Sequence, residues 1–273
     1  MRPISRIFLP LFALVPAMFA AGAAGGAELT EEEMRDFLLT AEVVRAIQTG
    51  KGTTSPYRFT LRKGEREHDA SFQPVDERTP LKRFDDGKTE INFRDSWKYN
   101  IAAYELARLL GLGDMMPVTV ERRWKRKTGS LSWWLPVVMD EEKRRRDRIP
   151  PPDPADWNRR MFKMAVFSEW VYDTDRNLGN ILYSKDWHVW MIDFSRAFRL
   201  YTTLRTPANL VRCERRLLER LRELRRADVE ARAGRWLTRL EIDGLMARRD
   251  RIVEHFDRLV LEKGERAVLY THP

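Results

Sequence analysis

The sequence predicts an α+β fold with two lobes, an N-terminal lobe built on an antiparallel sheet and a C-terminal lobe that is mainly helical. Three observations lead to this fold class. Short runs of alternating apolar and polar residues, typical of strands, are concentrated before residue 80. Longer runs with helical spacing fill the chain after residue 207. A stretch rich in charge and proline, 143–156, separates the two regions and has the composition of a linker.

Length and composition allow two small lobes with a substantial core. The chain has 273 residues, 43% of them hydrophobic, and its 9 Trp and 13 Phe argue against disorder. The formal net charge of +9 favours anionic partners such as nucleotide phosphates, lipid headgroups or nucleic acid, although a basic surface without such a partner gives the same charge. The sequence has no basic helix with interleaved aromatic residues, so nucleic acid is the weakest of these partners.

The first 27 residues are typical of an export signal. Arg2 and Arg6 give a positive start, residues 7–21 are apolar, and residues 21–23 and 25–27 both offer a small-x-small cleavage pattern. Prolines within the apolar stretch favour a cleaved signal over the alternative, an uncleaved membrane anchor. We therefore expect an exported bacterial protein, periplasmic or secreted, without a transmembrane segment after cleavage. The single cysteine of the chain excludes an intrachain disulfide.

The N-terminal lobe is expected to begin with a short helix, which three antiparallel strands follow. Thr30 and Glu33 have the spacing of a capping box, which marks the start of that helix. Residues 76–95 are polar and rich in charge, so a loop or flap is expected there. The three strands are predicted over residues 41–48, 57–61 and 68–75.

A second helix is predicted over residues 97–110, with Ser96 or Asp95 as its N-cap and Gly111 as its stop. Glu105 falls on the same helical face as two aliphatic residues, each four positions away. A carboxylate on an apolar stripe needs a partner. That partner is either a cation in a functional site or a nearby arginine at the edge of the core.

Two strands, a helix and two C-terminal helices complete the expected elements. The strands cover 118–124 and 130–139, and Asp153 or Asp156 caps the helix that follows them. The C-terminal helices cover 208–228 and the stretch from a second capping box at Thr238 to about residue 264. The expected organisation is a signal peptide (1–27), an N-terminal lobe (28–142), a linker (143–156) and a C-terminal lobe (157–273).

The clearest chemical signature follows the middle helix. Asp175 and Asn180 sit in a tight, glycine-containing segment, and two short apolar runs, 181–183 and 189–192, then predict a β-hairpin. Asn180 precedes the first strand and Asp193 follows the second, so the hairpin should bring their side chains together. An amide oxygen and a carboxylate are hard oxygen ligands that suit Mg²⁺. The alternative is a buried hairpin with polar turn residues and no chemistry.

An Asp followed five positions later by an Asn, with a second Asp 13 positions further on, resembles the catalytic core of the protein-kinase-like fold. The surrounding residues, Asp-Arg-x-x-x-Asn and Ile-Asp-Phe, look like those of lipid kinases (phosphatidylinositol 3- and 4-kinases), HipA-like bacterial kinases and secretory-pathway kinases. Residues 99–120 are similar to a helix and strand of the HipA-like and lipid-kinase-like proteins. The resemblance implies a two-lobed protein-kinase-like fold with ATP and Mg²⁺ as cofactors.

The resemblance also implies a role for each candidate residue. Asp175 would accept the proton of the attacking hydroxyl, while Asn180 and Asp193 would hold Mg²⁺ against the nucleotide phosphates. Glu105 would orient a lysine on those phosphates. Arg176 would offset local negative charge or meet a phosphate, the alternative being a structural salt bridge.

The sequence departs from the pattern of the resemblance at Gln73 and in the short Gly50-Lys-Gly52 phosphate loop, and Asp193 is followed by Phe-Ser instead of Phe-Gly. Gln73 stands in the third strand where a phosphate-binding lysine is expected, and a glutamine donates hydrogen bonds but carries no charge. The first hypothesis is therefore an ATP- and Mg²⁺-dependent phosphotransferase acting on a hydroxyl of an unknown protein, sugar or lipid. The second is an exported pseudokinase, a binding module with little or no turnover. Intact Asp175, Asn180 and Asp193 favour the first hypothesis, whereas Gln73 and the export signal favour the second.

Overall fold

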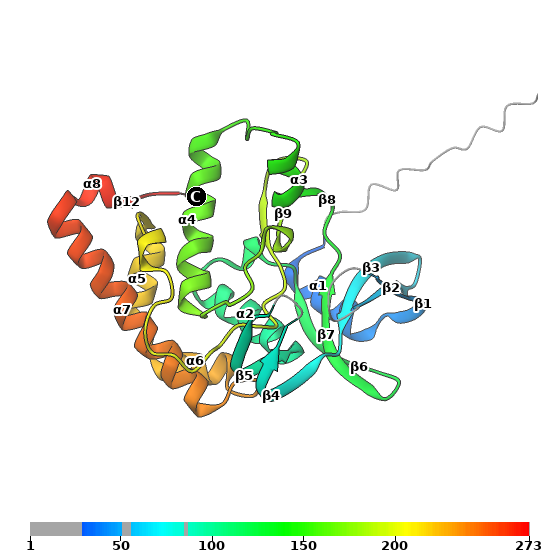
Figure 1. Ribbon diagram of the computed structural model, residues 1–273. Helices are drawn as coiled ribbons and strands as arrows, with labels where there is room; N and C mark the ends of the chain where they lie inside the picture. The colour runs from blue at the N-terminus through cyan, green and yellow to red at the C-terminus, as the bar shows by residue number, and fades with distance from the viewer. Residues whose placement is uncertain (1–28, 51–55, 85–86, 273) are drawn as a thin grey trace, which may run out of the picture.

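The computed structural model describes residues 29–50, 56–84 and 87–272. An antiparallel sheet forms the N-terminal region and helices form most of the C-terminal part (Figure 1), which confirms the predicted fold class. The predicted export signal, 1–27, lies outside the described residues. Within the described ranges, no helix has both the length and the apolar composition needed to cross a membrane.

Five antiparallel strands make up the N-terminal sheet, and the three predicted strands before residue 80 are all among them. Adjacent strands in the sheet are β1 (Glu42–Gln48), β2 (Tyr57–Lys63), β3 (Arg66–Gln73), β7 (Lys127–Trp133) and β6 (Thr119–Trp124), in that order. The alternation of the sequence decides which side chains are buried, because successive residues of a strand point to opposite faces.

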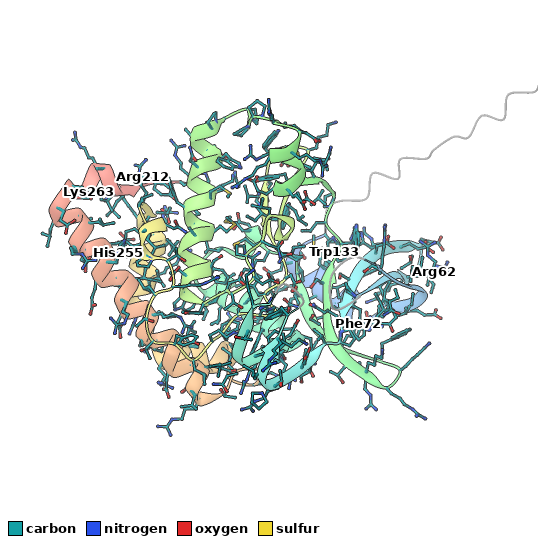
Figure 2. All side chains as sticks on the ribbon, in the orientation of Figure 1. Arg62, Phe72, Trp133, Arg212, His255 and Lys263 are labelled. Atoms are coloured by element: carbon teal, nitrogen blue, oxygen red, sulfur yellow. The ribbon has the colours of Figure 1, made fainter. Side chains whose placement is uncertain are left out.

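One face of this sheet carries the core of the N-terminal region. Phe59 and Phe72 are fully buried, and their rings stack with centroids 4.9 Å apart. Helices α1 (Glu31–Thr40) and α2 (Trp97–Leu109) pack against β6 and β7. Figure 2 places Phe72 and Trp133 within the sheet and Arg62 at its outer edge. Gln73, the last residue of β3, is buried as well.

Both helices begin where the sequence predicts. Thr30 and Glu33 form the reciprocal capping box of α1, with the Thr30 amide donating to the Glu33 carboxylate over 2.8 Å. Ser96, and not Asp95, is the N-cap of α2, since its hydroxyl accepts from the Lys98 amide. Gly111 follows the helix with φ +69°, a left-handed conformation that a residue with a Cβ rarely adopts.

Residues 76–95, predicted as a loop or flap, are not an irregular loop, because strands β4 (Asp76–Arg83) and β5 (Thr89–Ser96) form an antiparallel hairpin there. Backbone hydrogen bonds between the two strands hold the hairpin together, and an ion pair of Lys82 with Glu77 (2.6 Å) lies along β4 itself. Most of its side chains are exposed, so the strands lack the apolar alternation by which a strand is recognised in a sequence.

The single strand predicted over 130–139 is two strands in the structure. Strand β7 ends at Trp133, and Pro136, which has no amide hydrogen, lies in the break before β8 (Val137–Asp140). Strand β8 pairs with β9 (Ile181–Ser184) in a sheet of order β10-β9-β8, where β10 is Val189–Met191. Residues 137–140 therefore join the sheet that carries the candidate site.

A short helix occupies the first part of the expected linker. Helix α3 (Glu141–Arg146) begins with Glu141, whose fully buried carboxylate accepts hydrogen bonds from Arg144, Arg145 and Tyr183. These hydrogen bonds hold the pKa of Glu141 at about 2, against the effect of its burial. The contact with Tyr183 attaches α3 to strand β9, so this part of the segment packs against the C-terminal lobe.

Helix α4 (Pro154–Trp170) leads to the candidate site. Asp153 caps it by accepting from the amides of Ala155 (2.9 Å) and Asp156 (3.0 Å). The end of the chain returns to this helix (Figure 1), where the Tyr270 hydroxyl donates to the Arg159 carbonyl over 2.6 Å.

The first of the two predicted C-terminal helices is wrong in extent. The stretch 208–228 contains strand β11 (Cys213–Glu214) and helix α5 (Arg215–Glu223), and then the start of a second helix. The other prediction is confirmed, since α7 (Arg239–Lys263) begins at the capping box of Thr238 and Glu241 and ends at Gly264. The remaining elements are α6 (Arg226–Ala233), α8 (Glu265–Val268), β12 (Leu269–Tyr270) and the 3-10 turns η1 (Gly113–Met115), η2 (Leu178–Asn180) and η3 (Pro207–Asn209).

Candidate active site

The hairpin of β9 and β10 joins the residues on either side of it, as the sequence predicts. The Ile192 amide donates to the Asn180 carbonyl over 3.1 Å. Arg176 reinforces this closure, because one guanidinium nitrogen donates to the carbonyls of both Asn180 (2.9 Å) and Ile192 (2.7 Å). Asp193 follows Ile192 directly, so Arg176 holds the backbone at both candidate metal ligands.

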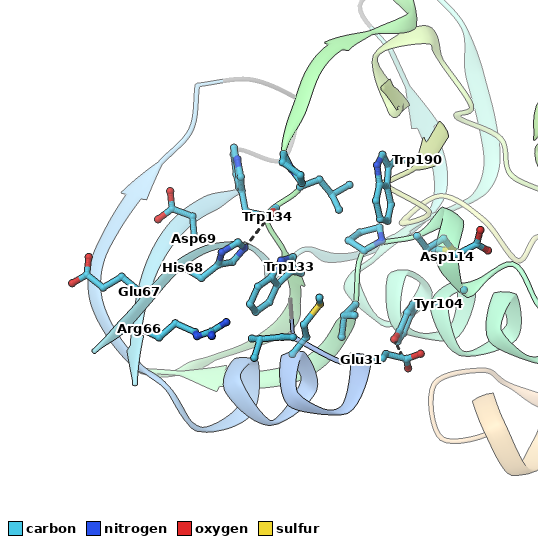
Figure 3. A pocket seen from close by; sticks show the side chains of 18 of the residues that line it. Glu31, Arg66, Glu67, His68, Asp69, Tyr104, Asp114, Trp133, Trp134 and Trp190 are labelled. Atoms are coloured by element: carbon cyan, nitrogen blue, oxygen red, sulfur yellow. Dashed lines mark hydrogen bonds between the residues drawn. The ribbon is translucent and has the colours of Figure 1, made fainter. Parts of the chain in front are cut away.

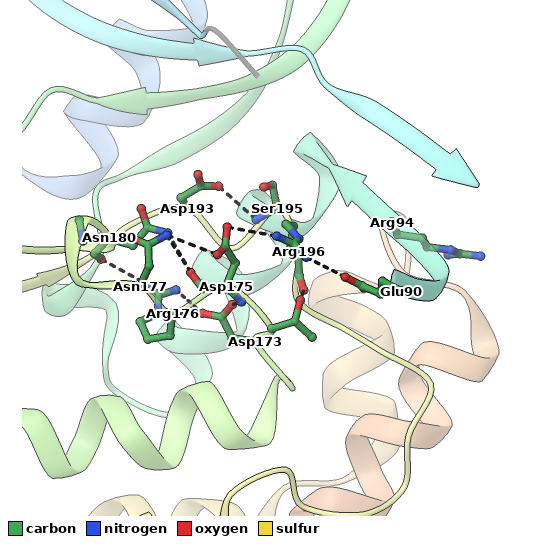
Figure 4. A network of polar contacts seen from close by, with 12 residues as sticks. Glu90, Arg94, Asp173, Asp175, Arg176, Asn177, Asn180, Asp193, Ser195 and Arg196 are labelled. Atoms are coloured by element: carbon green, nitrogen blue, oxygen red, sulfur yellow. Dashed lines mark hydrogen bonds and ion pairs between the residues drawn. The ribbon is translucent and has the colours of Figure 1, made fainter. Parts of the chain in front are cut away.

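Asn180 is oriented by a hydrogen bond to the loop before it. Its side-chain Nδ2 donates to the backbone carbonyl of Asp175 over 3.0 Å (Figure 4). This contact fixes the side-chain amide and leaves Oδ1 as the atom that can bind a cation. Turn η2, which precedes β9, is capped by Asn177, whose Oδ1 accepts from the Gly179 amide over 2.9 Å.

Asp193 has a backbone conformation that is uncommon for a residue with a side chain. Its φ is +55°, in the left-handed region. The Ser195 amide donates weakly to its carboxylate over 3.4 Å. Burial raises the pKa of Asp193 and the neighbouring charge of Asp175 adds to this, whereas hydrogen bonds from Ser195 and the charge of Arg176 act in the opposite direction. A bound cation would favour the ionised form.

Asp175 is accessible to a substrate, since 39% of its side chain is exposed. Buried Asp173 holds the backbone here, accepting from the Asp175 amide (3.0 Å) and from Arg176 Nε (2.7 Å). On its other side, Asp175 Oδ2 lies 3.6 Å from Nη1 of Arg196, which also donates to Glu90 on strand β5 over 2.7 Å (Figure 4). No pattern in the sequence indicates that Arg196 lies near Asp175.

Hydrogen bonds of Asn100, on helix α2, connect Gln73 to the residues of the candidate site. The Asn100 side chain donates to Gln73 Oε1 (2.5 Å) and accepts from the backbone amide of Phe194 (2.7 Å). It also donates to the Ser130 hydroxyl over 3.3 Å. Asn100 thus connects strand β3 to the residue after Asp193. Asn100 was not predicted as a site residue. The one indication in the sequence is a polar amide among the apolar residues early in α2.

The role expected for Glu105 is wrong. Its buried carboxylate lies 2.7 Å from Arg35, 3.0 Å from Arg108 and 3.5 Å from Arg232. Five residues of an α-helix turn through roughly 140°, so a helix that directs Asn100 toward Gln73 must direct Glu105 elsewhere. The alternative interpretation, a carboxylate bonded to arginines at the edge of the core, is the one that the structure supports.

A further carboxylate, Asp95, lies at the end of strand β5 and is 7% exposed. Burial, together with the negative charges of Asp193 and Glu77, raises the pKa of Asp95 to about 6, while a hydrogen bond from Ser195 opposes the shift. The Ser96 amide donates to the Ser195 carbonyl over 2.8 Å, which attaches β5 to the loop after Asp193.

The donor set fits Mg²⁺ with a phosphorylated ligand better than a closed metal site. Among the described residues, no three His, Cys, Asp or Glu side chains gather closely enough to hold a metal ion. Mg²⁺ in nucleotide sites is usually held by one or two protein oxygen ligands, with phosphate oxygens and water completing the shell. The Asn180 amide and the Asp193 carboxylate can supply that number.

A cavity of about 980 Å³ lies at the junction of β3, β7 and the loop after α2, and its walls do not include the candidate catalytic residues (Figure 3). His68 stacks on Trp133 with ring centroids 3.6 Å apart, and His68 Nε2 lies 3.1 Å from the Trp134 carbonyl. Burial lowers the pKa of His68, which favours the neutral ring. The walls also carry Tyr104, Asp114 and Trp190.

Comparison with solved structures indicates the same fold that the motifs predict. The chain is similar to hydra Fam20, solved with sugar (TM-score 0.66, 15% identity, 88% of this chain and 92% of that chain covered). It is also similar to the Golgi casein kinase with Mn/ADP bound (TM-score 0.64, 14% identity, 89% and 80% covered). A third similar structure is the Helicobacter pylori proinflammatory kinase CtkA (TM-score 0.55, 11% identity, 83% and 98% covered).

Similarity at this level of identity establishes the protein-kinase-like fold, and with it the fold part of the predicted resemblance. No protein-family model matches the chain, and no curated protein matches it by sequence.

Proposed function

We propose that the chain is an exported phosphotransferase that uses ATP and Mg²⁺ to phosphorylate a hydroxyl group of an unknown acceptor. The observation that carries the proposal is the arrangement of Asp175, Asn180 and Asp193 around one loop and hairpin, with Asp175 accessible and Asn180 fixed by its bond to the Asp175 carbonyl. Proteins of this fold include one solved with Mn/ADP, which supports a nucleotide and a divalent cation as ligands.

The residues of the chain divide the chemistry between them. Asn180 and Asp193 would hold Mg²⁺, which supplies positive charge to the nucleotide phosphates. Asp175 would orient the acceptor hydroxyl and accept its proton as that oxygen attacks the terminal phosphate. Arg176 keeps its structural role, since its guanidinium already bonds Asp173 and the carbonyls of Asn180 and Ile192.

A specific observation favours the second candidate function, an exported pseudokinase. The position of the phosphate-binding lysine holds Gln73, whose partner Asn100 is also uncharged. A neutral pair can donate hydrogen bonds to a phosphate but cannot neutralise its charge. A protein with this pair could bind a nucleotide without transferring its phosphate.

The acceptor class stays broad in this proposal. Among the similar structures, one was solved with sugar and another is a casein kinase, so sugars and proteins are both supported as acceptors, and lipids follow from the sequence resemblance alone. The export signal predicted over 1–27 supports a periplasmic or secreted location.

Calorimetric titration with ATP and Mg²⁺ tests the site directly. The wild-type protein is expected to bind saturably, and Asp193→Ala to lose that binding while keeping its thermal melting temperature. Asp186→Ala is the matched control, because it removes a carboxylate from the turn at the opposite end of the same hairpin. Equal binding by wild type and Asp193→Ala would overturn the site assignment.

Transfer of the terminal phosphate from radiolabelled ATP to the protein itself or to water then separates the two functions. Measurable transfer that is lost in Asp175→Asn supports the phosphotransferase. Saturable binding without any transfer supports the pseudokinase.

A further inference from the structure

The proposed function leaves an electrostatic question at the terminal phosphate. Phosphoryl transfer depends on positive charge placed around the transferred group, and in this fold a strand lysine usually contributes part of it. Here that position holds the neutral pair of Gln73 and Asn100. A cation from another part of the chain is needed if the site is to hold a triphosphate well.

Arg196 lies three residues after Asp193, and its guanidinium lies beside the Asp175 carboxylate. Its Nη1 lies 3.6 Å from Asp175 Oδ2, beyond the normal length of a hydrogen bond. Its Nε is buried and has no hydrogen-bond partner among the described residues. Nε therefore makes no hydrogen bond, and Nη1 makes only a long ion pair with the carboxylate that is expected to receive the acceptor proton.

The other side of Arg196 is held by the β4–β5 hairpin. Nη2 donates to Glu90 over 2.7 Å, and the guanidinium lies over the rings of Phe84 (5.2 Å to the centroid) and Phe93 (5.3 Å). Cation–π contacts and an ion pair from one element fix the direction of a planar guanidinium. Fixed direction is what a group needs if it is to stabilise developing charge without reorganising.

Neighbouring cations are held by other partners. Arg176 bonds Asp173 and two backbone carbonyls. Arg199 is 6% exposed, and it donates to the Arg94 carbonyl and pairs with Glu90. Lys98 pairs with Asp76 at 2.9 Å. Arg196 combines exposure of 20% of its side chain with contact to Asp175, so an anion approaching Asp175 would meet it first.

We propose that Arg196, held by Glu90, binds the terminal phosphate of the nucleotide and replaces the absent strand lysine. In the transfer step, the acceptor oxygen forms the new bond to phosphorus, the bond from phosphorus to the leaving oxygen of the nucleoside diphosphate breaks, and the acceptor proton goes to Asp175. Arg196 compensates the negative charge of the three remaining oxygens of the phosphoryl group. Glu90 is a positioning residue, because it acts through Arg196.

Calorimetric titration with two probes tests this inference, which rests on the proposed function. The probes are ADP with Mg²⁺ and the non-hydrolysable triphosphate AMP-PNP with Mg²⁺. Only AMP-PNP carries a terminal phosphate for Arg196 to contact. Arg196→Gln is expected to weaken AMP-PNP binding at least about tenfold more than ADP binding, as the loss of one charge-assisted phosphate contact would do. Arg196→Lys, which keeps the charge, should recover part of the difference.

Two further variants complete the design. Glu90→Gln should weaken AMP-PNP binding selectively but less than Arg196→Gln, because the arginine stays and only its position is released. Arg258→Gln is the charge-matched control, since this exposed arginine lies on α7 away from the site. It should bind both probes as the wild type does.

The outcomes separate failure of the inference from failure of the proposed function. Equal weakening of both probes in Arg196→Gln, or no weakening of either, overturns the inference while wild-type binding still supports the nucleotide site. If the wild-type protein binds neither probe with Mg²⁺, the proposed function fails and the inference falls with it.

Discussion

Replacing Asn100 should loosen the connection between helix α2 and the residues around Asp193. In the structure, Asn100 accepts from the buried Phe194 amide (2.7 Å) and donates to Gln73 Oε1 (2.5 Å). Asn100→Ala leaves both groups without these partners in a site where Asn100 itself is 8% exposed. An unsatisfied buried polar group costs about 1–3 kcal/mol, so the two together should lower the free energy of unfolding by about 2–6 kcal/mol.

Urea unfolding followed by tryptophan fluorescence measures this change. Asn158→Ala is the matched control, because Asn158 is an exposed asparagine on helix α4 and its replacement reports the helix propensity of alanine alone. Asn100→Asp is the informative second variant. Its carboxylate can still accept from Phe194, and the Gln73 amide can flip to donate to it. We therefore expect Asn100→Asp to cost less stability than Asn100→Ala.

The same variants should also affect ligand binding, because the Phe194 amide is adjacent to Asp193. Asn100→Ala should weaken the binding of Mg²⁺ and ATP at least about tenfold, in line with the free energy of one or two lost hydrogen bonds. If Asn100→Ala unfolds within about 0.5 kcal/mol of Asn158→Ala, the hydrogen bonds through Asn100 do not hold the site and the reasoning is refuted.

Two other variants test the assignments of Glu105 and Asp95. Glu105→Gln should lower the free energy of unfolding by about 1–3 kcal/mol, because the buried Glu105 carboxylate pairs with three arginines. It should leave the affinity for ATP and Mg²⁺ within about twofold, and a large loss of affinity would return Glu105 to the site. The folded-state pKa of Asp95, about 6, is above its usual value of 3.8. Its ionisation therefore destabilises the folded protein above pH 6, by up to about 3 kcal/mol, and this penalty disappears as the pH falls toward 4. In urea unfolding with EDTA present, Asp95→Asn should be more stable than the wild type at pH 7.5 and equal to it at pH 4; equal stability at both values would contradict the assignment.

The sequence alone determined the parts of this protein that depend on local chemistry. Capping residues marked the starts of α1, α2 and α7, since a side chain that satisfies the first amides of a helix lies within three residues of them. The closeness of Asn180 and Asp193 was predictable for a similar reason, because a hairpin necessarily returns the chain to the residue before its first strand.

The contacts between distant segments were decided only by the tertiary structure. Helical spacing places Asn100 and Glu105 on different faces of α2, but it does not say which face meets strand β3. The β4–β5 hairpin could not be predicted from the sequence, because its largely exposed strands carry no apolar alternation. The contact of Glu90 with Arg196 depends on that hairpin and could not be predicted either. The apolar run over 130–139 suggests one continuous strand, but after Pro136 the chain leaves the first sheet. Strand β8 then pairs with β9, more than forty residues later in the sequence. Such contacts depend on which surfaces remain to be buried once the elements have formed, and local sequence does not contain that information.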